Sequence, residues 1–295
     1  MNPDVKWTYL CRTEVKDKLE KRNIFVSKHI VKMLFHINQF KKRKISKKGT
    51  IKDVEGRDEQ FKKINNLKRF YLSRGYAVLS IDSKKKEPLG QLYRAGKVYA
   101  EKPLKSFDHD YPHLQTGKII PHGIYDVGMN EGYINLNGSC DTSELFYDSM
   151  IWWWNNFGKN NYSKTDKLLL LCDAGGSNGC NHHVFKEAVQ KLSDKIGLTI
   201  RVAHYPSYCS KYNPIEHRLF CHVTRALDGI ILDSATTIKN LIETRVTTKT
   251  NLKCYANIID KIYETGKKAS DDFLDNCRII KDNVFGKWNY LAKPS

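Results

Sequence analysis

The stretch that decides the fold is KLLLLCDAGGSNG, residues 167–179. Its run of four leucines and a cysteine predicts a strand buried on both faces, because a half-exposed strand would alternate apolar and polar residues. The strand ends at Asp173, and the glycines that follow predict a sharp turn. A helix is expected at residues 181–196 and another strand, TIRVAH, at residues 199–204. This order predicts parallel strands joined through a helix.

The rest of the chain after residue 76 extends this pattern. Further strands are predicted at residues 76–81, 123–129 and 133–138, and helices at residues 142–158, from residue 215 onward and at residues 236–245. The polar stretch between the first two strands is expected to be an extended insertion, and the segment FGKWNY at residues 285–290 has no assignment from its spacing. The mixed order predicts an α/β fold with helices on both faces of one sheet.

The first 50 residues have a different pattern. Residues 12–22 and 28–37 predict two short helices, and Ser27 is a suitable N-cap for the second. In the second helix four apolar residues share one face while Lys28 and Lys32 point elsewhere; the four are Ile30, Val31, Leu34 and Phe35. Two interpretations stay open: a helix-turn-helix unit with the second helix as recognition helix, or simply two packed amphipathic helices.

A basic run, KKRKISKK, follows at residues 41–48. It predicts an extended linker able to lie along phosphates, with a solvated charge run as the competing interpretation. We therefore expect a helical DNA-binding segment with its basic linker at residues 1–50 and a second domain at residues 51–295.

The charge balance points to a polyanionic partner. The chain has a formal net charge of +18 and a pI near 9.4. Residues 1–70 contain 20 Lys and Arg against 8 Asp and Glu, which is +12 of that total. Such an excess is not needed for folding, and nucleic acid is the most common reason for it, ahead of an anionic membrane or an acidic protein. With 40% hydrophobic residues, the chain can bury a core.

The eight cysteines stand singly and form no Cys-x-x-Cys pair. This favours reduced thiols and a cytoplasmic location over a disulfide framework. No stretch approaches the roughly 20 apolar residues of a membrane span, and no apolar signal region begins the chain.

A zinc site at Cys172, Cys180, His182 and His183 fits no familiar ligand spacing. The glycine-rich turn lacks the Gly-Lys-Ser/Thr of a Walker motif.

Three acidic residues are candidates for chemistry. Asp82 and Asp173 each follow an apolar strand, and ligands in α/β sheets bind beyond the carboxyl ends of strands. Glu216 lies near a helix start. Taken singly, each aspartate also fits a helix N-cap or turn, and a carboxylate at a helix start is favoured by the helix dipole. Together they suit hard cations such as Mg²⁺, two of which can promote phosphodiester chemistry.

Three blocks carry a specific resemblance. VLSIDSKKKEPLG (78–90), LLLLCDAGGSNG (168–179) and HYPSYCSKYNPIEHRLF (204–220) resemble the acidic blocks of bacterial insertion-sequence DDE transposases. The chain is most similar to the ISAzo-type group, also described by the Rhodopirellula-type transposase DDE domain. IIPHGIYDV (119–127), the tryptophans at 152–154 and FGKWNY (285–290) agree with it too.

The resemblance implies a ribonuclease H-like catalytic domain at residues 51–295 with a C-terminal extension. It implies that Asp82, Asp173 and Glu216 are catalytic and hold two Mg²⁺ or Mn²⁺ ions. The implied activity is strand cleavage at transposon ends and attack of the freed 3′-hydroxyl on target DNA by two-metal-ion phosphoryl transfer. The implied partners are double-stranded DNA at transposon ends and target, with a homo-oligomer assembled on it. The implied location is the bacterial cytoplasm, in association with the nucleoid.

We expect DNA contacts from basic residues beside the three carboxylates and on the second helix; these are Lys84, Lys85, Lys86, Lys211, Arg218, Lys28 and Lys32. Family members usually carry more sequence before the helical segment, so the chain is expected to be shortened at its N-terminus. Two alternatives stay open beside the active transposase: a non-catalytic DNA-binding remnant, and a ribonuclease H-like structure-specific nuclease.

Overall fold

The computed structural model describes residues 5–43, 54–107, 111–246 and 249–295. The chain divides into two compact units, Met1–Lys52 and Asp53–Ser295, and each is described here by itself. The expected boundary at residue 50 lies outside the described residues, as do residues 44–48 of the expected basic linker.

The first unit contains two helices, α1 (Arg12–Glu20) and α2 (Lys28–Ile37). The Ser27 hydroxyl accepts a hydrogen bond from the Ile30 N–H at 3.2 Å, so α2 begins at the predicted cap. The buried face of α2 is narrower than expected. Val31 is fully buried, whereas Ile30 and Leu34 remain 43% and 42% exposed.

The second unit is built on a sheet that has nine strands within the described residues, in the order β7-β4-β3-β1-β5-β6-β9-β8 with β2 beside β3. The strands are β1 (Ala77–Ser83), β2 (Glu87–Leu89), β3 (Gly117–Asp126), β4 (Glu131–Asn137), β5 (Lys167–Asp173), β6 (Thr199–Tyr205), β7 (Lys253–Ile258), β8 (Ile280–Lys281) and β9 (Asn289–Ala292). Strands β5 and β6 run parallel to β1, and β3 runs antiparallel to β1 and β4. The central order β4-β3-β1-β5-β6, with β3 alone reversed, is the ribonuclease H-like arrangement and confirms the predicted fold class.

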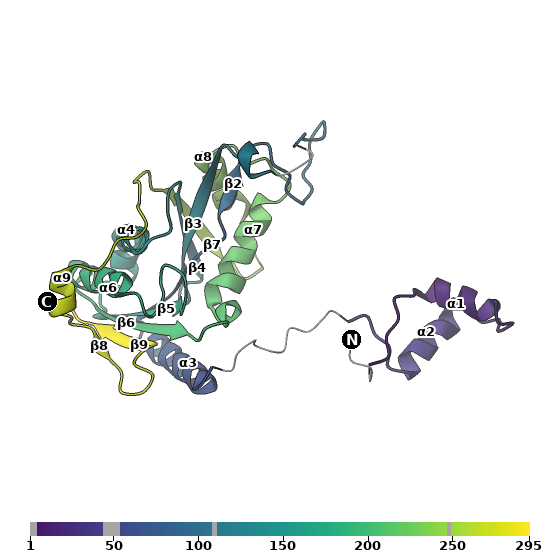
Figure 1. Ribbon diagram of the computed structural model, residues 1–295, viewed down its shortest axis with the longest axis horizontal. Coiled ribbons are helices and arrows are strands. Elements are labelled where there is room, and N and C mark those ends of the chain that lie inside the picture. Colours follow the sequence, from purple (N-terminus) through teal and green to yellow (C-terminus); the bar gives the residue numbers. More distant parts are fainter. Residues whose placement is uncertain (1–4, 44–53, 108–110, 247–248) are drawn as a thin grey trace. The chain divides into compact units, whose positions relative to one another are not determined.

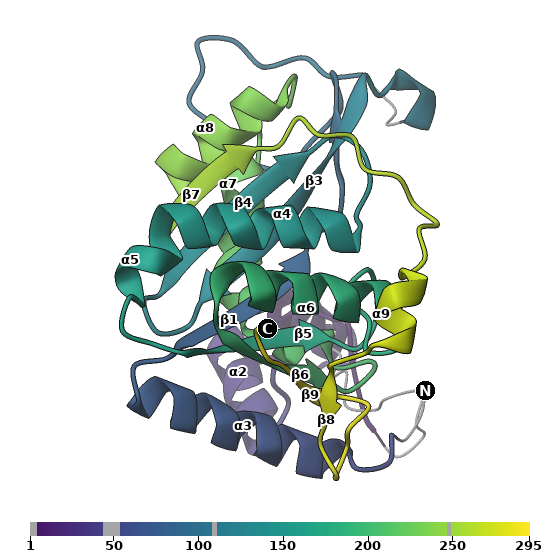
Figure 2. The ribbon, with the colours of Figure 1, turned by 90° about the vertical axis from the view of Figure 1, so that its left-hand side faces the viewer.

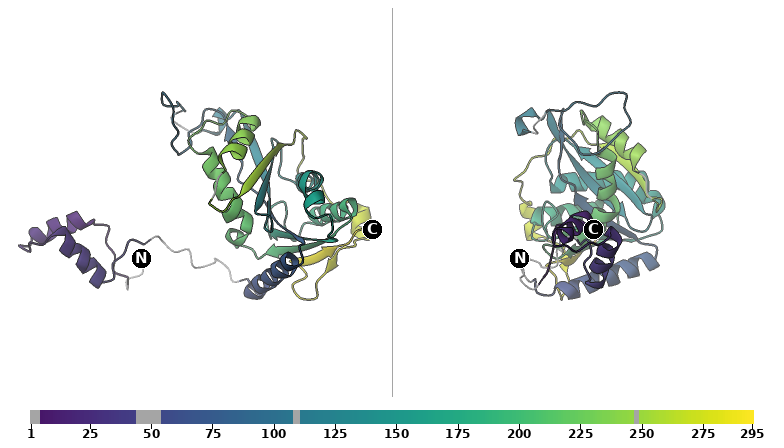
Figure 3. Two further views of the ribbon diagram at one scale, coloured as in Figure 1. Left: turned by 180° about the vertical axis from the view of Figure 1, so that it is seen from behind. Right: turned by 90° about the vertical axis from the view of Figure 1, so that its right-hand side faces the viewer.

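Helices cover both faces of this sheet (Figures 1 and 2). They are α3 (Arg57–Ser73), α4 (Ser143–Trp153), α5 (Lys159–Asn161), α6 (His183–Ile196), α7 (Cys221–Leu227), α8 (Ala235–Arg245) and α9 (Asp271–Asp275). Short π-helices, Trp154–Gly158 and Glu216–Phe220, extend α4 and precede α7, and 3₁₀ turns lie at Pro112–Leu114 and Ser210–Tyr212. Helices α4 and α6 lie on one face, and α7 and α8 lie on the other (Figure 3). The described residues contain no helix with the length and apolar character needed to cross a membrane.

The leucine run of β5 explains why both faces must be covered. Leu168 and Leu170 pack with α4 and α6, while Leu169 and Leu171 pack with α3. Neighbouring residues of a strand point to opposite faces, so an unbroken apolar strand needs a core on each side. The prediction of a strand buried on both faces is therefore confirmed.

Four strands, β2, β7, β8 and β9, have no counterpart among the predicted elements. Strand β7 pairs in parallel with β4, and β9, which begins in the unassigned segment FGKWNY, pairs antiparallel with β6. Strand β3 is also longer than expected at its start, beginning at Gly117 and passing through Pro121. The Pro121 carbonyl accepts a hydrogen bond from the Lys84 N–H at 2.9 Å, which ties this start to the end of β1.

A notch in the β3–β4 hairpin receives the π-helix Glu216–Phe220. A Cβ added to Gly123 would lie 2.5 Å from a Phe220 ring carbon and 2.8 Å from the Ile215 methyl, and a Cβ added to Gly132 would collide with Leu219. Two glycines therefore allow the helix to sit directly on the hairpin. This close approach fixes the height of the π-helix above the sheet, and with it the position of Glu216.

Filling the notch is expected to destabilise the fold. Gly123→Ala should lower the free energy of unfolding by about 1–3 kcal/mol, because the new methyl group forces Phe220 or Ile215 to move. Urea denaturation measures the effect. Gly138→Ala, on the same hairpin, is the control: the nearest atom to its new methyl is 3.9 Å away, so little change is expected. Equal losses in the two variants would contradict the notch.

Candidate active site

Asp82 and Asp173 lie side by side at one edge of the sheet. Strands β1 and β5 are parallel neighbours in which Ser80 pairs with Leu171, so two residues further on Asp82 and Asp173 reach the same level. The intervening Ile81 and Cys172 both point into the core beneath α4 and α6. Because side chains alternate along a strand, both aspartates point to the opposite face.

Glu216 is tied to the same place through Asn213. The buried Asn213 side chain accepts a hydrogen bond from the Ser80 hydroxyl at 2.5 Å and donates one to the Ile81 carbonyl at 3.3 Å. The Glu216 N–H donates to the Asn213 carbonyl at 3.1 Å. The Ile215 N–H donates to the same Ser80 hydroxyl at 3.0 Å. The start of the π-helix is thus fastened to β1 two residues before Asp82.

Burial and neighbouring negative charge raise the pKa of both aspartates. Burial raises the pKa of Asp82 to about 7, and the charges of Asp173 and Glu216 add to the rise, while the Ser83 N–H opposes it. Burial and the charge of Glu216 raise the pKa of Asp173 to about 6, against the lowering effect of Asn213. One carboxylate oxygen of Asp173 is buried without a hydrogen-bond partner. The site therefore gathers negative charge that the described residues leave uncompensated.

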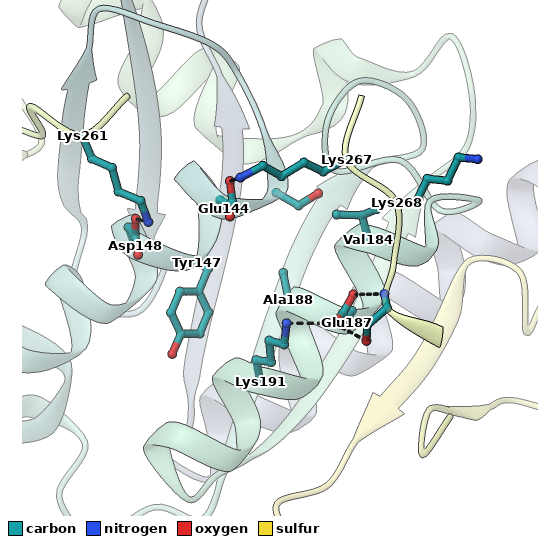
Figure 4. A pocket seen from close by; sticks show the side chains of 12 residues that line it. Glu144, Tyr147, Asp148, Val184, Glu187, Ala188, Lys191, Lys261, Lys267 and Lys268 are labelled. Atoms are coloured by element: carbon teal, nitrogen blue, oxygen red, sulfur yellow. Dashed lines mark hydrogen bonds and ion pairs between the residues drawn. The ribbon is translucent and has the colours of Figure 1, made fainter. Parts of the chain in front are cut away.

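Several other carboxylates of this unit have cationic partners. A pocket of about 410 Å³ lies between α4 and α6. Each acidic side chain that lines it has a cationic partner (Figure 4). Each pair joins a lysine Nζ to a carboxylate oxygen. The distances are 2.8 Å for Lys261 and Asp148, 2.8 Å for Lys267 and Glu144, and 2.7 Å for Lys191 and Glu187. In the described part of the chain, by contrast, Asp82, Asp173 and Glu216 form no ion pair. In a chain with a net charge of +18, unpaired acids at one spot are a specific feature.

The donor set fits a metal that keeps substrate oxygens as ligands. Within residues 5–43, 54–107, 111–246 and 249–295, no three His, Cys, Asp or Glu side chains form a group that could hold a metal ion, so Asp82, Asp173 and Glu216 do not make a preformed three-ligand site. Mg²⁺ commonly uses one or two carboxylates and fills its other positions with water and phosphate oxygens. The zinc alternative loses its support, because Cys172 is buried in the core whereas His182 and His183 are exposed.

A fourth carboxylate was not among the candidates from sequence. Asp141 accepts a hydrogen bond from the Ser83 hydroxyl at 2.7 Å and further raises the pKa of Asp82. It lies in the loop before α4, 59 residues after Asp82, and no local pattern marks it.

The expected DNA-binding residues fall into three groups: exposed residues of the second unit, Lys84, and two residues of the first unit. In the first group, Lys211 and Arg218 are exposed on either side of Glu216, and Lys85 and Lys86 are exposed after β1. Lys84 instead forms an ion pair with Glu87, which Arg94 also binds at 2.8 Å. The last group, Lys28 and Lys32, is exposed on α2 in the other unit.

One basic residue was missed from sequence. Lys68 on α3 has a lowered pKa because it is partly buried and because Arg218 lies nearby. Two like charges near each other repel, and an anion bound between them would relieve that repulsion. The pair joins residues 150 positions apart, so only the folded structure brings it together.

Comparison with known proteins gives one family match. The model of the Rhodopirellula transposase DDE domain family matches residues 1–294. Among solved structures, the chain is similar to a Mos1 pre-cleavage transpososome at 13% identity, covering 81% of this chain and 72% of that chain, with a TM-score of 0.45. It is also similar to a Mos1 strand transfer complex (14% identity, 84% and 74% covered, TM-score 0.46). No curated protein matches the sequence.

Removing one buried charge is expected to stabilise the metal-free fold. The pKa of Asp82 is about 7 in the folded chain against a usual 3.8. Because the folded pKa is raised, stability is highest below about pH 4 and is lost as the pH rises through about 7. At about pH 8 in EDTA, the free energy of unfolding of Asp82→Asn should therefore be about 2–4 kcal/mol higher than that of the unchanged chain. This difference should be smaller at about pH 5.

The control for this measurement is Asp282→Asn. Asp282 is held by Arg201 at 2.7 Å and by Lys63 at 2.6 Å, so its loss should destabilise the fold at both pH values. Urea denaturation at the two pH values compares the variants. A gain for Asp82→Asn that is the same at both pH values would show that the ionised form of Asp82 is not its source.

Proposed function

This chain belongs to the Rhodopirellula transposase DDE domain family, and we propose that Asp82, Asp173 and Glu216 are the carboxylates with which it cuts DNA. It is a DDE transposase, an enzyme that cleaves and transfers DNA strands. The proposed reaction is strand cleavage at transposon ends followed by transfer of the freed 3′-hydroxyl to target DNA. The observation that carries the proposal is the gathering of these carboxylates, unpaired among the described residues, at one sheet edge of a strongly basic chain.

The charge of the site supports divalent cations as its cofactor. Burial raises the pKa of Asp82 to about 7 and that of Asp173 to about 6, and repulsion by neighbouring carboxylate charges adds to both rises. A cation between them relieves this repulsion, as a lysine does for carboxylates elsewhere in the chain. Two bound Mg²⁺ or Mn²⁺ ions would supply activation of the attacking oxygen and stabilisation of the leaving one. In this proposal, Asp82, Asp173 and Glu216 hold both ions.

The surrounding residues position the carboxylates and the DNA. Asn213 and Ser80 keep the Glu216 helix at a fixed height on β1 through buried hydrogen bonds. Lys68 and Arg218 are proposed to contact phosphates of the bound strand, since their mutual repulsion is relieved by an anion. Lys85, Lys86 and Lys211 extend this contact. The proposed substrate is double-stranded DNA.

Substitution of the three carboxylates tests the catalytic proposal. We expect Asp82→Asn, Asp173→Asn and Glu216→Gln each to lower metal-dependent cleavage of transposon-end duplex by more than about a hundredfold, because even indirect partners of metal ligands cost 10–100-fold. Binding of the same DNA should persist. Gel analysis of a labelled duplex with Mg²⁺ or Mn²⁺ measures cleavage, and a filter assay measures binding.

The control is Asp148→Asn, which removes a carboxylate that Lys261 and the Tyr263 hydroxyl neutralise away from the site. It should retain cleavage. If a triad variant cleaves at the rate of this control, that residue is not a catalytic carboxylate. If the unchanged chain cleaves under no divalent ion, the non-catalytic DNA-binding remnant is favoured instead.

Salt dependence tests the phosphate contacts. Each lost phosphate contact reduces the slope of log affinity against log salt by about 0.9 for duplex DNA. Lys68→Gln combined with Arg218→Gln should therefore flatten the slope by about two and weaken binding to every duplex sequence alike. Lys261→Gln, which removes a lysine already paired with Asp148, serves as the control and should leave the slope unchanged. An unchanged slope in the double variant would remove Lys68 and Arg218 from the interface.

A further inference from the structure

The loop between β6 and the Glu216 helix carries a tyrosine that folding does not explain. Tyr208 has a φ of +63°, a left-handed conformation that bulky residues rarely adopt. Of the six non-glycine residues with positive φ in the described chain, three are asparagines, which tolerate it. The Tyr208 side chain is 61% exposed and makes no hydrogen bond or ring contact with the described residues. Neither its backbone nor its packing therefore favours a tyrosine here.

Tyr208 stands in a loop whose base is firmly anchored beside the carboxylates. Tyr205, buried at the end of β6, lies opposite Asp173 in the strand register. Cys209 is buried directly after Tyr208. The loop ends at Asn213, whose hydrogen bonds hold the start of the Glu216 helix. A strained residue on a rigid base is presented in one direction, since the anchors on both sides fix its backbone.

A second aromatic and a cation lie on the same loop. Tyr212 is 44% exposed. Its ring contacts the Phe61 ring edge-on, with 5.1 Å between the two ring centroids. The Lys211 ammonium lies 5.0 Å from the centre of the Tyr212 ring. On the other side, the Arg57 guanidinium lies 5.8 Å from the centre of the Phe61 ring. Exposed rings with cations beside them are the usual platform for unpaired nucleotides, because bases stack on the rings and phosphates contact the cations.

We propose that Tyr208 stacks on an unpaired base of the DNA strand held at the carboxylates, with Lys211 and Tyr212 extending the contact along that strand. The inference rests on the proposed function, which brings a strand end to this edge of the sheet. The charge at the loop favours nucleic acid over a protein partner, because Lys211 lies on the loop and Arg57 lies beside Phe61, the ring that Tyr212 contacts. The inner faces of paired bases are covered by stacking, so the contact requires a nucleotide outside the duplex.

The test compares binding of two probes. One is a blunt duplex, and the other is the same duplex with a short unpaired oligothymidine tail at a 3′ end. Fluorescence anisotropy with Ca²⁺ measures their affinities. The unchanged chain should bind the tailed probe more tightly, and Tyr208→Ala should lose roughly 5- to 100-fold of that preference. Tyr208→Phe should keep it, and both variants should bind the blunt duplex alike.

Two further variants separate stacking from damage to the loop. Tyr208→Gly suits the left-handed backbone, so its melting temperature should be unchanged or higher while the tail preference is lost. Tyr99→Ala removes an exposed tyrosine outside this loop and should keep the preference. The proposal is overturned if the unchanged chain shows no tail preference, or if Tyr208→Ala and Tyr208→Gly retain it.

The same probes distinguish this inference from the catalytic proposal. Asp82→Asn should abolish cleavage and keep the tail preference, since it leaves Tyr208 in place. Loss of the preference in Tyr208→Ala together with cleavage that survives Asp82→Asn would support stacking and refute the assignment of Asp82. Cleavage lost in Asp82→Asn together with a preference unchanged in Tyr208→Ala would refute stacking alone.

Discussion

The second unit holds two aspartates, partly removed from water, at one edge of its sheet, and this constraint shapes the rest of the unit. Asp82 and Asp173 stand at one level because the ladder between β1 and β5 allows no slip: a shift by one residue would turn every leucine of β5 to the wrong face. Burial raises the pKa of both groups and neighbouring carboxylate charges add to the rise, so the metal-free fold carries an electrostatic cost at neutral pH. The apolar cores on both sheet faces hold the strands in register against that cost.

Glu216 reaches the same point by different means. It comes from a helix rather than a strand, so its height depends on packing against the hairpin and not on a ladder. Gly123 and Gly132 remove the side chains that would hold the helix away, and Asn213 fixes its first turn to β1. The acidic site thus combines a rigid pair from the sheet with a third group whose position depends on a few close contacts. Such dependence on supporting residues is typical of catalytic sites.

The sequence was sufficient where the signal was local. The unbroken leucines predicted β5, and Ser27 predicted the start of α2. Contacts between distant residues were not accessible in the same way. Strand β7 pairs with β4 more than 100 residues earlier, and Lys68 meets Arg218 from another helix. Lys84 has a local partner in Glu87, three residues later, and its contact with DNA stays a prediction.

The loop from Tyr205 to Asn213 shows how stability and function divide over a few residues. At Asn213 the backbone N–H and carbonyl and both polar atoms of the side chain are hydrogen-bonded, which is what a buried polar residue requires. At Tyr208, five residues earlier, the backbone is strained and the ring has no partner among the described residues. A chain selected for stability alone would place glycine there, because glycine adopts positive φ without strain. An exposed ring that costs stability at the margin of an acidic site is therefore best explained by a ligand that the isolated chain lacks.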